Sequence, residues 1–109
     1  MKRIAVDDLP GDPLAAASVF DQHWLPYAEE TLAAGEDLML AFAPADHTHR
    51  AWRLAVVTGL ARKYAPLRVN GVAGEGAVLA QAERYLSAAP GVTGQYLPLD
   101  GNGAGNPAH

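Results

Sequence analysis

The 109-residue sequence contains no cysteine, so neither a disulfide framework nor a zinc site built from thiolates is available to it. A cytoplasmic protein is the simplest interpretation of that absence. Basic side chains are also few, because eight lysines and arginines stand against twelve acidic residues and the formal net charge is −4. Nucleic-acid binding usually requires a basic surface, so we expect no nucleic-acid partner.

Long apolar stretches are missing as well. No segment has the roughly 20 consecutive apolar residues that cross a bilayer, and residues 1–13 lack the apolar run of a signal peptide. We therefore expect no membrane partner. Half of the residues are hydrophobic and 18% are charged, which is typical of one small globular domain with a buried core. We predict a single domain over residues 1–101 and a flexible, glycine-rich tail over residues 102–109.

Short apolar runs alternate with helical patterns along the chain, which predicts an α/β fold. The continuous apolar run at residues 38–42 is typical of a parallel strand that is covered on both faces. We expect four parallel strands in sequential order, alternating with three helices. The expected strands are residues 3–6, 38–42, 67–72 and 95–99, and the expected helices are residues 14–33, 46–65 and 77–89.

Aspartate and proline mark the helix boundaries. Asp12, followed by proline, and Asp46 both stand where an N-cap belongs, since a carboxylate can accept the unpaired N–H groups of a first turn. Pro26 lies inside the first helix and predicts a kink, because proline has no N–H to donate. Pro66 ends the second helix by forcing the preceding residue out of the α region.

Several short motifs occur in a fixed order in the second half of the chain. They are Leu60-Ala61, Tyr64-Ala65-Pro66, Arg68-Val69-Asn70-Gly71-Val72 and Val92-Thr93-Gly94-Gln95, the last followed by a strand and Asp100-Gly101. In this order the motifs resemble the C-terminal half of the short-chain dehydrogenase/reductase family, over roughly residues 14–101. The resemblance implies a Rossmann-like half-domain, with the last helix on the face of the sheet opposite to the other two.

The same resemblance indicates that the catalytic residues of the family are lost. Counting back from Tyr64 places the family's catalytic tyrosine on Asp46 and its catalytic lysine on Arg50. A carboxylate cannot replace a phenol as proton donor at neutral pH without a large rise in its pKa. The catalytic serine, the glycine-rich loop that holds the cofactor pyrophosphate and the substrate-binding lid are also absent from the sequence. We therefore expect no NAD or NADP cofactor and no dehydrogenase activity.

Asp46, His47, His49 and Arg50 form the one dense polar group of the sequence, at the predicted carboxyl end of a strand, where α/β folds place ligands. A metal site needs three or more converging ligands, and two histidines two positions apart on a helix point in different directions. A helix cap with exposed histidines beside it is the simpler interpretation. Binding of a small ligand or anion, or an enzyme of new chemistry, are the alternatives for this cluster.

The resemblance also implies two surfaces for oligomerisation. In the family, the long helix and the active-site helix pair with their copies in a four-helix bundle, and the last helix and last strand pair with theirs. We expect a non-catalytic interaction module that forms a homodimer through helices 14–33 and 46–65, or that binds a full-length short-chain dehydrogenase. The candidate interface residues are Phe20, Trp24, Tyr27, Trp52, Ala55 and Val56.

Overall fold

The computed structural model describes residues 1–99, and the predicted tail at residues 102–109 lies outside the described part. Strands and helices alternate along the chain. In chain order the elements are β1 (Lys2–Val6), α1 (Pro13–Val19), a π-helical turn (Phe20–Trp24), α2 (Leu25–Ala33), β2 (Leu38–Phe42), a 3₁₀ turn (His47–His49), α3 (Arg50–Lys63), β3 (Val69–Ala73), α4 (Ala77–Ser87) and β4 (Tyr96–Pro98).

All four strands are parallel and lie in the order β1-β2-β3-β4. Ile4 pairs with Leu40, Leu40 with Gly71, and Gly71 with Tyr96. When α1, the π-turn and α2 are counted as one helix, the prediction of four sequential parallel strands and three helices is confirmed. Because the strands are parallel, the segments that follow β1 and β2 meet at one edge of the sheet, which we call the carboxyl edge.

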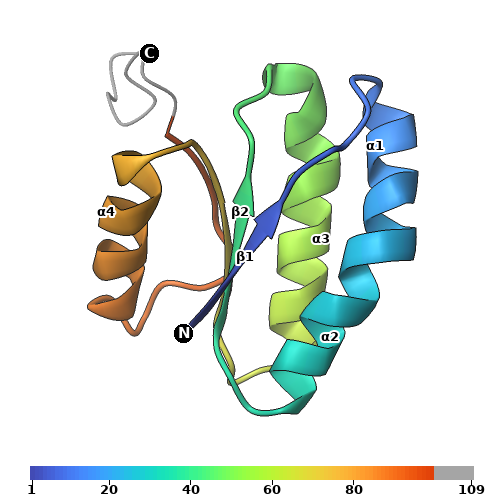
Figure 1. Cartoon of the computed structure of the whole chain (residues 1–109). Helices are drawn as coiled ribbons and strands as arrows, with labels where there is room; N and C mark the ends of the chain where they lie inside the picture. Colours follow the sequence, from blue (N-terminus) through green and yellow to red (C-terminus); the bar gives the residue numbers. More distant parts are fainter. Residues whose placement is uncertain (100–109) are drawn as a thin grey trace.

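Helices cover both faces of the sheet. Figure 1 shows α1, α2 and α3 on one face and α4 alone on the other, as the family resemblance implied. Each face has its own hydrophobic core. The larger core includes Ile4, Phe20, Leu32, Leu40, Phe42, Val57 and Leu60, and the smaller core under α4 includes Met39, Ala41, Val72, Ala82 and Leu86.

The two predicted helix caps are confirmed. A carboxylate oxygen of Asp12 accepts the backbone N–H of Ala15 at 2.9 Å. Asp46 accepts both the backbone N–H, at 2.9 Å, and the hydroxyl of Thr48. Aspartate is favoured at these positions because the first N–H groups of a helix have no partner within the helix.

The helix around Pro26 changes its winding just before the proline. The backbone N–H of Leu25 donates to the carbonyl of Phe20, five residues earlier, which is the hydrogen bond of a π-turn. Proline would otherwise clash with the carbonyl four residues before it. The irregularity that was predicted as a kink at Pro26 is therefore a π-turn over residues 20–24.

The outward orientation expected of Phe20 is wrong. Its side chain is fully buried, and its ring centroid lies 6.0 Å from that of Phe42 and 5.6 Å from that of Trp52. Leu60 is buried as well, whereas Tyr27 and Ala55 are exposed and Val56 is half-buried. The ring of Phe20 therefore belongs to the core and is not available to an interface.

Candidate functional site

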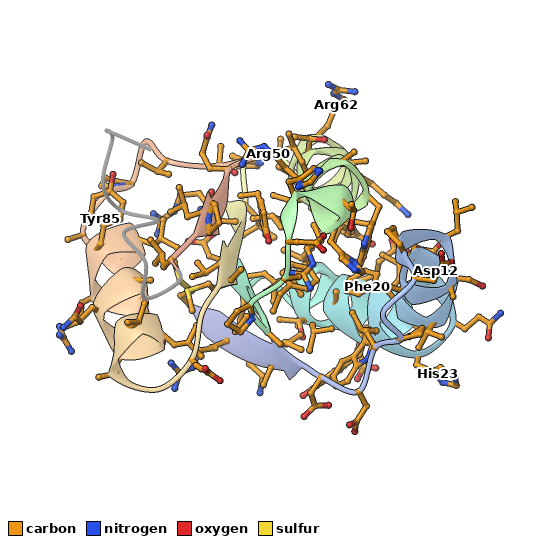
Figure 2. The ribbon with its side chains drawn as sticks, turned by 90° about the horizontal axis from the view of Figure 1, so that it is seen from above. Asp12, Phe20, His23, Arg50, Arg62 and Tyr85 are labelled. Atoms are coloured by element: carbon orange, nitrogen blue, oxygen red, sulfur yellow. The ribbon has the colours of Figure 1, made fainter. Side chains whose placement is uncertain are left out.

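The four residues of the predicted polar cluster lie at the start of α3 but do not converge. Asp46, His47 and Arg50 are exposed, and His49 is buried. Within residues 1–99, no group of three or more histidine, aspartate or glutamate side chains is placed to hold a metal ion. His23 projects away from Arg50, on a different side of the molecule (Figure 2). These side chains therefore form no common site.

Asp46 is held in its ionised form. The pKa of its carboxyl group is lowered from the ordinary value, first by the hydrogen bond from the Thr48 hydroxyl and then by the Thr48 backbone N–H. A proton donor in place of the family's tyrosine would need the opposite shift, toward a raised pKa. Asp46 therefore serves as a helix cap and is unsuited to general acid catalysis.

His49 is a structural residue, which corrects the expectation of an exposed histidine. The indole N–H of Trp52 donates to its Nδ1 at 3.0 Å, so Nδ1 is the acceptor and Nε2 carries the proton. Nε2 in turn lies 2.9 Å from the carbonyl oxygen of Gly11, to which it donates. Both ring nitrogens are therefore used to fasten the loop after β1 to α3.

Arg53 is the polar residue of this region that sequence reasoning missed. Only 3% of it is exposed, and its Nη1 donates to the carbonyl of Ala43 at 3.0 Å and to the hydroxyl of Tyr96 at 2.9 Å. Its guanidinium carbon lies 4.6 Å from the centroid of the Phe42 ring. Arg53, Val57 and Leu60 are the buried residues of α3, and they are four and three positions apart. This helical spacing is the signal that could have placed Arg53 on the inward face of the helix.

A cavity of about 210 Å³ lies beside Arg53 and His49 at the carboxyl edge of the sheet. The loop after β1 forms one wall, the segment after β2 forms another, and α3 closes the third side. The lining residues are Val6, Asp7, Asp8, Leu9, Pro10, Gly11, Ala43, Pro44, Ala45, His49 and Arg53. Of the predicted polar cluster only His49 is among them, so the cavity and the cluster are different features.

Two motifs of the family resemblance, Arg68-Val69-Asn70 and Val92-Thr93-Gly94-Gln95, are hydrogen-bonded to each other. Buried Asn70 donates through Nδ2 to the carbonyl of Val92 at 3.0 Å and accepts the backbone N–H of Gln95 at 3.1 Å. The backbone N–H of Val69 donates to the Thr93 hydroxyl at 3.0 Å. These motifs therefore fix β4 beside β3, which is a structural role.

Arg68 joins three segments at the opposite edge of the sheet. Its backbone N–H donates to Asp37 at 2.8 Å, and its Nη1 donates to the carbonyls of Leu86, at 2.7 Å, and Ala89, at 3.0 Å. The carbonyls at the end of α4 thus receive a cation, which is favourable at a helix C-terminus. The hydrogen bond from the Arg68 backbone is the main cause of the lowered pKa of Asp37.

The outer surface between α2 and α3 is hollowed by about 230 Å³. Exposed Ala55 and Gly59 line it, together with Leu25, Glu29, Val56, Leu60 and Lys63. At one end Glu29 accepts from Lys63 at 2.5 Å and from the Tyr64 hydroxyl at 2.6 Å. We call this surface the α2–α3 groove.

No helix within residues 1–99 combines the length and the apolar composition needed to span a membrane. A family model described as short chain dehydrogenase-like protein matches residues 4–99. No curated protein and no solved structure matches the chain. The family match covers most of the sequence and agrees with the parallel sheet and with the hydrogen-bonded motifs of β3 and β4, so this chain belongs to the family of short chain dehydrogenase-like proteins.

Proposed function

We propose that this protein is a non-catalytic interaction module that forms a homodimer through the α2–α3 groove. A full-length short-chain dehydrogenase is the alternative partner for the same surface. The observation that carries the proposal is the groove itself, which presents small exposed residues on an apolar floor between two helices.

The spacing of Ala55 and Gly59 supports close helix packing. These two small residues are four positions apart, so they lie on one side of α3, one turn above the other. Without bulky side chains there, the backbone of a second helix can approach closely, within the 8–10 Å at which helix axes usually pack. Leu25 and Val56 flank them and supply apolar area. A two-fold copy would cover the same patch on both protomers.

The residues at the family's catalytic positions support the non-catalytic part of the proposal. Asp46 is an ionised helix cap, and Arg50 is an exposed side chain that does not line the cavity. The alternatives of ligand binding or new enzyme chemistry by Asp46, His47, His49 and Arg50 acting together gain no support from the cavity at the carboxyl edge, because His49 is the one residue of these four that lines it. A cytoplasmic location agrees with the cysteine-free sequence.

Light scattering on the purified chain at micromolar concentration tests the proposal. We expect a dimer for the natural sequence and a folded monomer for Ala55→Glu, because the substitution would bury an unpaired charge at the seam. Ala77→Glu is the matched control, since Ala77 is an exposed alanine on α4 and should leave the dimer intact. A monomeric natural protein refutes the homodimer. A dimer that tolerates Ala55→Glu refutes this interface and directs attention to the final strand.

Calorimetric titration with NAD and NADP tests the loss of the cofactor site. We expect no binding at micromolar cofactor, because the chain lacks the glycine-rich turn that places a helix N-terminus at the pyrophosphate. The double variant Asp46→Tyr, Arg50→Lys should likewise show no turnover of ketones with NADH or NADPH. Turnover by this variant would show that the substitutions at positions 46 and 50 alone account for the loss of dehydrogenase activity.

A further inference from the structure

Among residues 1–99, the guanidinium of Arg53 has no anionic partner for its buried positive charge. Two neutral oxygens accept hydrogen bonds from its Nη1, Nε is buried without any partner, and no carboxylate within residues 1–99 forms an ion pair with it. Arginine has five N–H donors and cannot be deprotonated in proteins. Burying such a charge uncompensated is costly, so the fold retains Arg53 at an energetic disadvantage.

Aromatic rings hold the guanidinium in place. Its carbon lies 4.6 Å from the centroid of Phe42, 5.7 Å from that of Trp52 and 5.9 Å from that of Tyr96. Cation–π attraction to these rings offsets part of the cost of burial and fixes the plane of the guanidinium. The rings supply no strong hydrogen-bond acceptor. Nη1 already donates two hydrogen bonds and Nε is buried, so Nη2 is the nitrogen of Arg53 that is left to a ligand.

The cavity beside Arg53 is a suitable size for a small organic ion. Its volume of about 210 Å³ lies below the usual range of drug-sized pockets, which begins near 300 Å³. His49 forms part of the wall, and both of its ring nitrogens are hydrogen-bonded, one to Trp52 and the other to Gly11. His49 therefore shapes the cavity and has no ring nitrogen left for a ligand. Arg53 is therefore the one cationic side chain that lines the cavity within the described residues.

We propose that this cavity binds a small organic monocarboxylate, with Arg53 as the residue that recognises the carboxylate. Nη2 can donate a charge-assisted hydrogen bond to a carboxylate oxygen, which is stronger than a hydrogen bond between neutral groups. Asp7 and Asp8 line the same cavity and are exposed, so their charges oppose a doubly charged ligand such as phosphate more than a singly charged one. The ligand class is therefore a carboxylate of a few carbons, and the site is separate from the α2–α3 groove.

Titration of the full chain with propionate and pyruvate, followed by amide NMR, tests the proposal. We expect saturable binding with a Kd of about 1 mM or below, in the range that very small ligands reach. The shifted signals should be the amides of residues 7–11 and 43–45 and the indole N–H of Trp52. Propionamide, which has the same shape without the charge, should bind at least about tenfold more weakly, since it cannot form the charge-assisted pair.

Substitutions on α3 separate recognition from a purely structural role. Arg53→Met should lower the affinity about tenfold or more and leave the protein as stable as before or more stable, because an uncompensated buried charge is removed. Arg62→Met is the matched control, since Arg62 is an exposed arginine on the same helix (Figure 2) and should change the affinity less than about twofold. Arg53→Lys should fold and bind severalfold more weakly, because lysine keeps the positive charge and loses the Nη2 donor.

The proposal is overturned if neither carboxylate saturates the natural protein, if propionamide or inorganic phosphate binds as well as propionate, or if the shifts lie away from the cavity. It is also overturned if Arg53→Met unfolds the chain while Arg53→Lys binds as the natural protein does, because a general positive charge would then suffice. Ala55→Glu should bind propionate normally. Failure of the dimer and failure of the carboxylate site are therefore distinguishable.

Discussion

Replacing Gly71 with alanine should destabilise the protein through overpacking at the centre of the sheet. A Cβ at position 71 would lie 2.9 Å from Cγ2 of Val57 and 3.3 Å from the rings of both Phe42 and Tyr96. These three neighbours are buried core residues on β2, β4 and α3, so none can swing into solvent. The new methyl group must therefore displace packed side chains or separate α3 from the sheet.

The expected loss can be bounded. Inserting a methylene-sized group into a packed core typically costs about 1–3 kcal/mol. Replacing a glycine in a strand by alanine stabilises the folded protein by about 0.5–1 kcal/mol, because the unfolded chain then has less conformational entropy. The difference is a loss of about 0–2.5 kcal/mol, and the contact of 2.9 Å with Val57 favours its upper half, about 1–2 kcal/mol, which for a chain of this length lowers Tm by roughly 5–15 °C.

Thermal and urea unfolding followed by circular dichroism measure this change. Gly91→Ala is the matched control, because its Cβ would meet nothing within 4 Å, and it should leave stability unchanged or slightly raised. A Gly71→Ala protein as stable as the control refutes the reasoning, since it would mean that the contacts around Val57 relax without cost. Phe42 and Tyr96 also hold Arg53, so the same substitution should weaken binding of propionate.

Two further predictions concern the hydrogen bonds that join β3 to its surroundings. Asn70→Ala should destabilise the protein by about 1–3 kcal/mol in urea unfolding, because two hydrogen bonds of a buried amide are lost, and an unchanged stability would show that water replaces them. Asp37 has a lowered pKa in the folded chain, so its contribution to stability is present above its unfolded pKa of about 3.9 and is lost as the pH falls through the folded value. Asp37→Asn should therefore reduce the loss of stability below about pH 4 relative to the natural protein, and an identical pH dependence would contradict the assignment.

The fold was largely predictable because its signals are local. The run at residues 38–42 is bounded by Asp37 and by the segment that ends at Pro44, and β2 has the predicted limits. Asp12 and Asp46 cap the helices as expected. The inward position of Arg53 was not predicted, because arginine is mostly exposed in proteins, yet Arg53 lies on the buried side of α3 with Val57 and Leu60. Phe20 was misplaced because a large aromatic residue fits a core and an interface equally well by composition.

The candidate site was less predictable because its contacts are distant in sequence. Of the polar cluster, His49 alone lines the cavity, and its partner Gly11 is 38 positions away. Arg53 reaches Tyr96, which is 43 positions away. Spacing along one helix could not show either contact. The sequence placed a polar group at the correct edge of the sheet, and tertiary packing decided which of its members face the cavity.

The π-turn explains a spacing that an ordinary helix would not tolerate. Ala16, Phe20, Ala28 and Leu32 are all buried, and they recur at multiples of four. An α-helix turns about 100° per residue, so a strict spacing of four drifts by about 40° at each step and by roughly 160° from Ala16 to Leu32. The wider π-turn winds less per residue and absorbs part of that drift.

The phase of α1 relative to α2 therefore depends on one extra residue. Deleting exposed Gln22 would allow regular winding through the turn, and Ala16 and Leu32, then 15 residues apart, would differ by about 60° around the helix axis. Ala16 would therefore stay on the buried side, and Leu14 would stay exposed. A single-residue deletion at this point shortens the helix by about 1.5 Å and keeps the same side chains inside, whereas regular winding without the deletion would rotate α1 by about 100°.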